Sequence, residues 1–565
     1  MLKRLLRSPL RLPALKPYVP QPDDPSIFRF NAQRDGIVHE VVVRVVSEAA
    51  KDPAVLDETI NDTAIQERKR LAAQRDDETA QSYGFWDGVY RRLAKMDESE
   101  KRHALHEITA HMARDIAGNF DTRVYHMAES LVPRLLSGVM QPTSMLEELA
   151  GAQAQIDRLL ETEGPVEKLR ALSKRGTLVF TPTHSSNLDS VVLGYALQRN
   201  RLPPLVYGAG KNLFTNPIVS FFMHNLGAYR VDRRIQASLY KAVLKTYSCV
   251  LIERGFHSLF FPGGTRSRSN HLESRLKLGL AGSAVEAFTR SQALGHRTRV
   301  WFVPTTINYD LVLEAETLID DFLKERGKER YIIDDDEFSR VERWVSFFRK
   351  VLGLHSAAVV RFGEPVDPFG NPVAERGDSV VHGGRSIDPA TYVMRENHPV
   401  IDEARDRAYT RELADVLVRR FREETVVMGN QLVAHALYRR FVRATPGLDI
   451  FSRMREKGSV AVPIERLGAD VGEARDALLE LERQGRVHVS ETLRHARPLE
   501  TVHRALLSWQ GYHTKTAATL REDGVVIDDP SLLFYYQNRL VPFAEAIASD
   551  ADRPLAREIV NQQVR

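Results

Sequence analysis

A histidine and an aspartate stand five positions apart in the segment TPTHSSNLDS, residues 181–190. The segment follows the apolar run GTLVF and precedes VVLGYAL, so it lies where a strand would end and a helix begin. A carboxylate at Asp189, at the start of that helix, can reach back to the imidazole of His184. It would fix the tautomer and raise the basicity of the other ring nitrogen. The pair predicts a general base, but a lone histidine is usually a core or surface residue, so the prediction needs support elsewhere.

Two further segments place arginines beside glycines at the ends of apolar runs. They are GAYRVDRR, residues 227–234, and FPGGTRSRSN, residues 261–270. Glycine lets the backbone approach a ligand closely, and a guanidinium binds phosphate with two hydrogen bonds. Lys277 adds another cation. Exposed turn arginines would explain any one cluster, whereas three clusters at strand ends favour a phosphate site. A base beside a phosphate site indicates a phosphorylated alcohol as the nucleophile.

The block from about residue 165 to 400 alternates between strands and helices. Amphipathic segments such as SLYKAVLKTYSCVLIERG separate short β-branched and aromatic runs, which are GTLVFTP, PPLVYGAG, SLFFPGG, RVWFVPTTINY and AAVVRFGEP. This alternation predicts an α/β layer with a largely parallel sheet. Sites in such sheets collect at the carboxyl ends of the strands. His184, the PGGTRSR loop and the TTINYD segment can therefore converge on one cleft.

Helical periodicity occupies both sides of this block. From about residue 35 to 160, apolar residues recur every three or four positions in HEVVVRVVSEAA, AIQERKRLAAQ, ESLVPRLLSGVM and LEELAGAQAQIDRLLE. Residues 371–400 are polar and glycine-rich, which indicates a loop or excursion, and the helical period returns after about residue 405. The predicted division is a basic tail (1–34), a helical N-terminal domain (35–164), an α/β domain (165–404) and a helical C-terminal region (405–565).

One part of the C-terminal region, residues 459–490, has the helix, turn, helix and short wing pattern of a winged-helix module. Such a module is compatible with DNA binding. Its second helix would be a poor surface for phosphates because acidic side chains outnumber basic ones: Glu473, Asp476, Glu480 and Glu482 against Arg475 and Arg483. We expect a structural or membrane-facing appendage here, and no nucleic-acid partner.

Composition narrows the class of protein further. The net charge of +4 is small for 565 residues, and this length predicts two or three folding units. The single cysteine, Cys249, cannot form an internal disulfide and is expected to be a packing residue. No apolar run approaches the ~20 residues that span a bilayer, and no signal-peptide pattern is present.

The first residues alternate leucines with basic residues, a short pattern suited to the surface of an anionic bilayer. The basic residues are Lys3, Arg4, Arg7, Arg11 and Lys16. Pro9, Pro13 and Pro17 would cut any helix short, so a frayed tail is the alternative.

Three other motifs resemble known functional motifs but lack residues that those motifs require or have a simpler explanation. GAGKN, residues 208–212, lacks the earlier glycine of a P-loop and has Asn212 where a magnesium-binding Ser or Thr is required. The acidic run at residues 334–336 is better explained as a loop than as a metal site. Ser185 and Ser186 lack the GxSxG elbow of a serine hydrolase.

Taken together, four segments resemble, in order and approximate spacing, the four sequence blocks of the glycerolipid acyltransferases. They are HSSNLD; GKNLF with GAYRVDRR; FPGGTRSRSN followed by Lys277 and Gly279; and VPTTINYD with Glu314. The glycerol-3-phosphate acyltransferase branch is the most similar, because VRFGEPVD (360–367), TVVMGNQLVAHAL (425–437) and DDPSLLFYYQNRL (528–540) resemble its downstream segments. The resemblance covers roughly residues 165–545. It implies an α/β acyltransferase core with a mostly parallel sheet flanked by helices, plus helical N-terminal and C-terminal regions.

The resemblance assigns roles residue by residue. His184 would take the proton from the acceptor hydroxyl and Asp189 would orient it. Pro304 would lie on the acyl-donor side. The substrate-binding residues would be Arg233, Gly264, Thr265, Arg266, Ser267, Arg268 and Lys277, with the three arginines on the acceptor phosphate.

The implied reaction is that of a glycerol-3-phosphate 1-O-acyltransferase. A fatty acyl group would move from acyl-CoA or acyl carrier protein to the 1-hydroxyl of sn-glycerol 3-phosphate, giving lysophosphatidate for phospholipid synthesis. The alcohol would attack the thioester directly, with no covalent enzyme intermediate, cofactor or metal. The expected location is peripheral, on the cytoplasmic face of the cell membrane. The alternatives are lysophosphatidate or dihydroxyacetone phosphate as acceptor, and a non-catalytic lipid-binding scaffold of the same fold.

Three positions depart from the family pattern. The glutamate of the third block is Gly263, an aromatic residue of the second is Arg230, and the glutamate of the fourth is Asp310. The first departure removes one acceptor contact or leaves it to another residue, and it is what makes the scaffold alternative credible. It leaves the histidine and aspartate intact.

Overall fold

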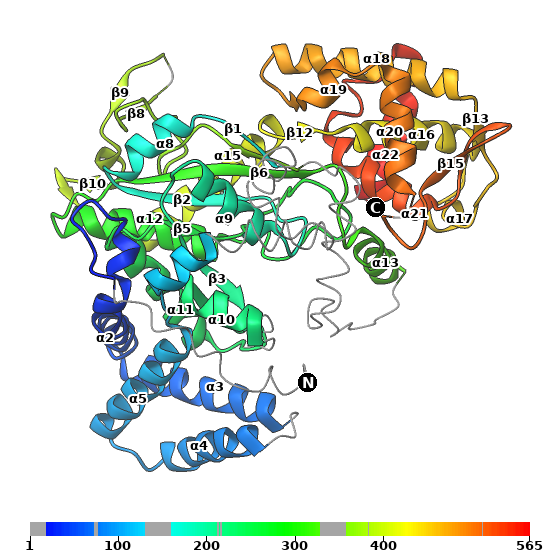
Figure 1. The fold of residues 1–565 in the computed structure, drawn as a ribbon. Helices are drawn as coiled ribbons and strands as arrows, with labels where there is room; N and C mark the ends of the chain where they lie inside the picture. The colour runs from blue at the N-terminus through cyan, green and yellow to red at the C-terminus, as the bar shows by residue number, and fades with distance from the viewer. Residues whose placement is uncertain are drawn as a thin grey trace.

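The computed structural model describes residues 18–72, 77–129, 160–211, 214, 217–327, 358–381, 383–510 and 512–564. Figure 1 shows N-terminal helices in blue, a sheet with flanking helices in cyan and green, and a C-terminal helical region in yellow, orange and red. The basic stretch before residue 18, the predicted helix at 129–140 beyond its first residue, Asn212 and the acidic run 334–336 lie outside the described residues.

The central sheet has seven strands in the order β1-β7-β6-β2-β5-β3-β4. Neighbouring strands are parallel except β6 and β7, which are antiparallel. The bounds are β1 Leu160–Glu163, β2 Thr177–Pro182, β3 Val206–Gly210, β4 Ala228–Val231, β5 Ser258–Leu259, β6 Val300–Tyr309 and β7 Ala358–Phe362. The prediction of an α/β core with a mostly parallel sheet is confirmed, and the carboxyl ends of β2, β5 and β6 share one edge.

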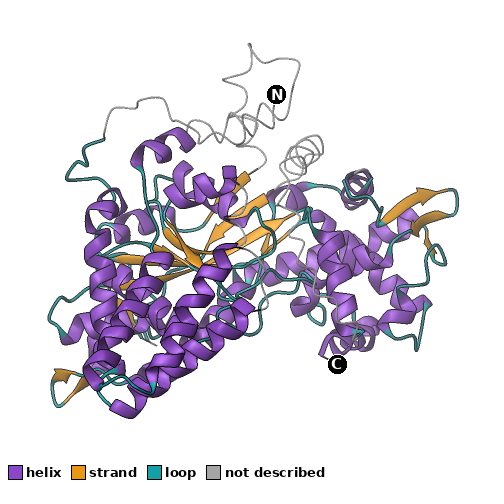
Figure 2. Ribbon diagram, turned by 90° about the horizontal axis from the view of Figure 1, so that it is seen from below, coloured by secondary structure: helices purple, strands orange, loops and turns teal. Residues whose placement is uncertain are grey.

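Helices cover both faces of this sheet (Figure 2). Along β2, Leu178 and Phe180 enter one hydrophobic core and Val179 enters the opposite one, which is the two-residue period of a strand. The first core includes α8 (Val166–Ser173), α9 (Asp189–Arg199) and the C-terminal helices; the second includes α11 (Ser238–Glu253), α12 (Leu278–Ala293) and α15 (Glu403–Glu423). Burial on both faces explains why GTLVF is a continuous apolar run.

The N-terminal part consists of η1 (Ser26–Arg29), α2 (Phe30–Ala49), α3 (Pro53–Ala72), α4 (Asp77–Leu93) and α5 (Glu98–Ile116). Helix α5 begins with a capping box between Asp97 and Glu100. The apolar residues of these helices share one core with α11, so this part packs directly onto the α/β layer.

The predicted helix that ends at residue 161 is wrong at its end. Leu160 and Glu161 belong to β1, which pairs with β7. Pairing with the sheet edge and burial of Leu160 (6% exposed) outweigh the local helical period there.

The C-terminal region packs around α16 (Gly429–Ala444), a helix that is buried along most of its length. Around it lie α17 (Ile450–Arg453), α18 (Ile464–Arg483), α19 (Glu491–His495), α20 (Pro498–Trp509), α21 (Pro530–Gln537), η5 (Asn538–Phe543), η6 (Asp550–Asp552) and α22 (Arg553–Val564). Two small sheets join these helices: β12 (Val426–Val427) with β14 (His488–Val489), and β13 (Ala461–Val462) with β16 (Gly524–Ile527) and β15 (Ala518–Arg521).

The predicted helix-turn-helix at residues 459–490 is wrong. Residues Ile464–Arg483 form one continuous helix, α18. Two glycines within this helix lie against a neighbouring helix: a Cβ at Gly468 would stand 2.6 Å from Leu499, and one at Gly472 would stand 3.3 Å from Pro498. Close packing against the start of α20 therefore explains both glycines.

The remaining elements are short. Residues 371–400 contain β8 (Ser379–Val380), β9 (Ser386–Ile387), η4 (Pro389–Val393), β10 (Met394–Arg395) and β11 (His398–Pro399), while α10 (Pro217–Asn225) and α13 (Ala315–Arg326) follow β3 and β6. Among the described residues, no helix combines the length and apolar character needed to cross a bilayer.

Candidate active site

His184 and Asp189 lie together at the carboxyl end of β2. The chain leaves the strand at Pro182, turns through residues 183–188 and enters α9 at Asp189. His184 Nδ1 lies 2.7 Å from Asp189 Oδ2. A carboxylate at Nδ1 places the ring proton there, so the lone pair is on Nε2. The tertiary structure thus gives the pair the geometry of a general base with its orienting acid.

Both oxygens of the Asp189 carboxylate accept hydrogen bonds. Its Oδ2 also accepts the backbone N–H groups of Ser185 (2.7 Å) and Ser186 (3.0 Å), and its Oδ1 accepts the Tyr309 hydroxyl (2.7 Å). Asp189 is fully buried. Burial and the nearby aspartate raise the pKa of Tyr309 well above its usual range, so the phenol remains a hydrogen-bond donor. These contacts leave the carboxylate one orientation.

The His184 ring stacks on Phe261, with the ring centroids 4.0 Å apart and the planes inclined by 21°. Phe261 follows β5, the strand next to β2. The histidine side chain keeps 15% of its surface exposed, so it is neither packed in the interior nor free on the surface. This limited access suits a base that must meet a substrate hydroxyl with little water around it.

The loop from β5 to α12, residues 260–277, closes over the histidine. Ser267 N donates to the His184 carbonyl oxygen at 2.7 Å, and Lys277 N donates to Pro262 O at 2.7 Å. Gly264 has φ +76°, and a Cβ there would stand 2.4 Å from Lys277 Cδ. A glycine is required at this position both by the left-handed backbone and by the lysine that crosses it.

A glutamate from further along the same loop stands where the third-block glutamate is missing. A Cβ at Gly263 would lie 3.0 Å from Glu273 Cγ, and Glu273 Oε1 accepts the His184 N–H at 2.8 Å. Burial raises the pKa of the Glu273 carboxyl, and the His184 amide and the charge of Arg539 oppose that rise. The Glu273 side chain thus occupies the space that a side chain at position 263 would enter.

A second glutamate secures the other half of the turn. Glu314 accepts the Ser186 hydroxyl at 2.8 Å and the Asn187 N–H at 2.9 Å, and Arg266 Nη1 lies 3.4 Å from it. Burial raises its pKa, while Arg266 and the two hydrogen bonds act in the opposite direction. Arg266 is thereby tied to the loop that carries His184.

The other predicted substrate-binding residues lie at the same sheet edge but at different distances from the histidine. Arg233 is exposed just after β4, three strands from β2, which is about 14 Å at the usual strand spacing. Arg268 Nη1 pairs with Glu325 on α13 at 2.7 Å, in an exposed position. Thr265 is exposed in the loop, and Pro304 is buried within β6 beside Thr181. Binding roles for these residues stay predictions.

Phe261, Glu273, Tyr309 and Arg539 contact the histidine or its turn and were given no role in the sequence analysis. Phe261 and Tyr309 lie within segments already singled out, so their place after β5 and at the end of β6 was a usable signal. Glu273 lies outside those segments, and Arg539 lies in the segment 528–540, whose resemblance did not indicate where it would dock; the loop and the C-terminal region bring these two residues to the site. Within the described residues, no group of three or more His, Cys, Asp or Glu side chains forms a possible metal site.

Residues 165–308, which include the histidine, its turn and most of the parallel sheet, match the family model described as Acyltransferase, so this part of the chain is similar to an acyltransferase domain. The chain is similar to a glycerol-3-phosphate acyltransferase of Ectopseudomonas mendocina (strain ymp), with 32% identity over 209 residues, which is 37% of this chain and 23% of the relative. It is also similar to a protein of the same name from Pseudomonas putida strain KT2440, with 28% identity over 275 residues, or 48% of this chain and 30% of the relative. These matches span less than a third of the relatives' length.

Proposed function

We propose that the protein transfers a fatty acyl group from a thioester to the 1-hydroxyl of sn-glycerol 3-phosphate, giving lysophosphatidate. The observation that carries the proposal is the 2.7 Å contact between His184 Nδ1 and the buried Asp189 carboxylate, at the sheet edge where the arginine-bearing loops also end. The names of the similar proteins support the choice of acceptor.

The proton transfers of the proposed reaction use His184 and Asp189. His184 Nε2 takes the proton of the acceptor hydroxyl while the oxygen attacks the thioester carbonyl carbon. Asp189 stabilises the imidazolium that forms. When the carbon–sulfur bond breaks, the imidazolium returns the proton to the departing thiolate, which leaves as a free thiol. His184 and Asp189 are the catalytic residues of this proposal.

The phosphate of the acceptor would be held by cations at the same edge. Arg266 and Lys277 lie on the loop that closes over the histidine, and Arg233 follows β4. A phosphate bound between them would place the glycerol carbons toward His184. Pro304 would border the acyl-donor side. The donor would be acyl-CoA or acyl carrier protein, and the protein would work peripherally at a membrane surface.

The test is release of free thiol from acyl-CoA with glycerol 3-phosphate as the only acceptor. We expect turnover by the wild-type protein and its loss in His184→Ala. A parallel panel of lysophosphatidate and dihydroxyacetone phosphate, with the same donor, decides the acceptor. If the protein binds acyl-CoA but releases no free thiol with any of these acceptors, the proposal would be wrong, and a non-catalytic lipid-binding scaffold would be the better interpretation. Gly263 was the reason for that alternative, and the Glu273 carboxylate beside it weakens the reason.

A further inference from the structure

The end of the chain reaches the proposed active site, although it lies some 350 residues from His184 in sequence. Asn538 Nδ2 donates to Ser269 O at 2.9 Å, and Asn270 Nδ2 donates to Tyr535 O at 3.3 Å. Helix α21 and η5 therefore contact the β5–α12 loop at Ser269 and Asn270. The C-terminal region is in direct contact with the loop that closes over the histidine.

Arg539, in η5, is buried in this junction. It is 1% exposed, and its Nη2 donates to Ser185 Oγ at 3.0 Å and to the Ile307 carbonyl oxygen at 3.4 Å. Ser185 is the residue after His184, so the guanidinium holds the catalytic turn directly. Its Nε and Nη1 are buried and have no hydrogen-bond partner among the described residues. A buried cation with two unsatisfied donors is costly unless an opposite charge lies nearby.

Glu273 supplies one opposite charge near Arg539, although among the described residues the two side chains form no direct ion pair. One of its oxygens accepts the His184 N–H, and the other is buried with no partner among the described residues. Burial raises the pKa of Glu273 and lowers that of Arg539, and the attraction between the two groups opposes both changes. The two side chains thus hold consecutive residues of the turn, His184 and Ser185, and stabilise each other's charge.

We propose that Glu273 and Arg539 act as one positioning pair for the His184–Ser185 segment, so that the C-terminal region is a working part of the active site. Neither residue needs to touch substrate. Their effect would be to keep the imidazole against Phe261 and within reach of the acceptor hydroxyl. The kinetic part of the test rests on the proposed acyl transfer.

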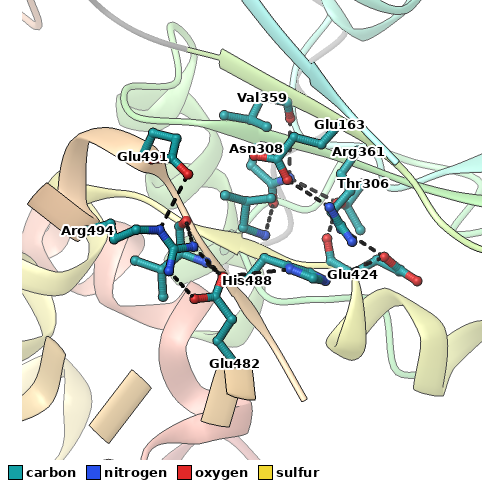
Figure 3. Close-up of polar contacts among 12 residues, drawn as sticks. Glu163, Thr306, Asn308, Val359, Arg361, Glu424, Glu482, His488, Glu491 and Arg494 are labelled. Atoms are coloured by element: carbon teal, nitrogen blue, oxygen red, sulfur yellow. Dashed lines mark hydrogen bonds and ion pairs between the residues drawn. The ribbon is translucent and has the colours of Figure 1, made fainter. Parts of the chain in front are cut away.

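A second polar junction shows how the C-terminal region is attached elsewhere, and it supplies a control (Figure 3). Arg361 on β7 pairs with Glu163 at 2.8 Å and with Glu424 at 2.9 Å, and Glu424 O accepts the Thr306 hydroxyl at 2.6 Å. His488 and Glu482 continue the network to Arg494. This junction links the same two parts of the protein through an arginine and a glutamate, and among the described residues it forms no hydrogen bond or ion pair with the His184 turn.

The kinetic test compares Arg539→Met with Arg361→Met in the full-length chain. We expect Arg539→Met to lower kcat by up to about 100-fold, the scale of a small misplacement of a catalytic group, with the KM for glycerol 3-phosphate unchanged. Arg539→Lys should restore part of kcat, and Arg361→Met should retain it. The effects of Glu273→Gln and Arg539→Met should not add in the double variant, because both side chains hold the same two-residue segment of the turn. Additive effects, or equal losses in Arg539→Met and Arg361→Met, would overturn the proposal.

A second measurement needs no turnover. The rate at which diethyl pyrocarbonate modifies His184, followed by mass spectrometry, reports how firmly the ring is held. It should rise in Arg539→Met and in Ser185→Ala, which removes the Arg539 acceptor with little change in volume, and remain at the wild-type value in Arg361→Met. An unchanged rate in Ser185→Ala and Arg539→Met would refute the positioning role. Absence of thiol release by the wild-type protein would refute the acyl transfer alone, since the labelling result stands independently.

Discussion

One oxygen of Asp189 binds His184 Nδ1 at 2.7 Å together with the amides of Ser185 and Ser186. The same carboxylate therefore orients the imidazole and fixes the turn that carries it. This double use explains why the acid stands at the first residue of α9, where backbone amides converge and a negative charge is favoured.

Asp189→Asn should lower kcat by as much as about 10⁴-fold, because a neutral amide cannot stabilise the imidazolium that forms during proton transfer. The amide oxygen can still accept the backbone N–H groups, so the fold should persist. Thiol release and thermal unfolding of the same preparation measure the two effects. Asp378→Asn, which alters an exposed pair with Arg299, is the control. Wild-type kcat in Asp189→Asn would contradict the assignment.

A glutamate introduced at position 263 should partly restore the kcat of a variant that lacks Glu273. Glu273→Ala removes the acceptor of the His184 N–H and should reduce kcat. In Gly263→Glu combined with Glu273→Ala, the new side chain begins 3.0 Å from the vacated Cγ position, so part of kcat should return. Gly263→Glu alone should be harmful, because both carboxylates would compete for one space. No gain in the double variant would show that the two positions are not equivalent.

Gly264→Ala should weaken acceptor binding, because the added Cβ displaces Lys277 as well as straining the backbone. A non-glycine residue at φ +76° costs about 1–2 kcal/mol, and the added Cβ must also displace Lys277. We expect an increased KM for glycerol 3-phosphate. Gly447→Ala provides the matched comparison, because that glycine has φ +73° with nothing within 4 Å of the added Cβ. Equal KM values in the two variants would show that Lys277 does not take part in substrate binding.

Arg233→Met and Arg268→Met should differ. Loss of charge-assisted hydrogen bonds to a phosphate costs about 1.5–3 kcal/mol, so Arg233→Met should raise the KM for glycerol 3-phosphate roughly 10- to 100-fold. Arg268 already pairs with Glu325 in an exposed position, where a salt bridge contributes about 1 kcal/mol or less, so its loss should change little. An equal rise in KM for both variants would place both arginines on the phosphate.

Asp310→Asn should stabilise the protein at neutral and alkaline pH. Burial raises the pKa of Asp310 from 3.8 to about 6. Above pH 6 the Asp310 carboxyl is ionised in both states, but ionisation is less favourable in the folded state. This difference lowers the free energy of unfolding by at most about 3 kcal/mol. As the pH falls from 6 toward 3.8, the folded state takes up the proton first and this loss disappears. An asparagine keeps the acceptor for Asn430 N, which lies 3.0 Å from Asp310 Oδ1.

Urea unfolding of both proteins at pH 8 and at pH 4.5 measures this effect. The difference in the free energy of unfolding between Asp310→Asn and the wild-type protein should be largest at pH 8 and smaller at pH 4.5. An advantage independent of pH would mean that packing, rather than ionisation, distinguishes the two side chains.

The sequence contained enough to predict the sheet and the proximity of His184 and Asp189. Apolar runs such as GTLVF must be buried on both faces, and alternation with helices makes neighbouring strands parallel. His184 and Asp189 are five residues apart, so one local turn brings them together whatever surrounds it. It did not reveal that Gly468 and Gly472 lie within one helix, because the contact that explains them comes from α20.

The residues that support the pair were decided by tertiary structure alone. Glu273 reaches His184 across a closed loop, Tyr309 reaches Asp189 across the sheet, and Arg539 reaches Ser185 from the far end of the chain. Hydrogen bonds formed over such separations leave no period or spacing in the sequence. They arise because buried charges and amides must find partners wherever the packed chain brings them.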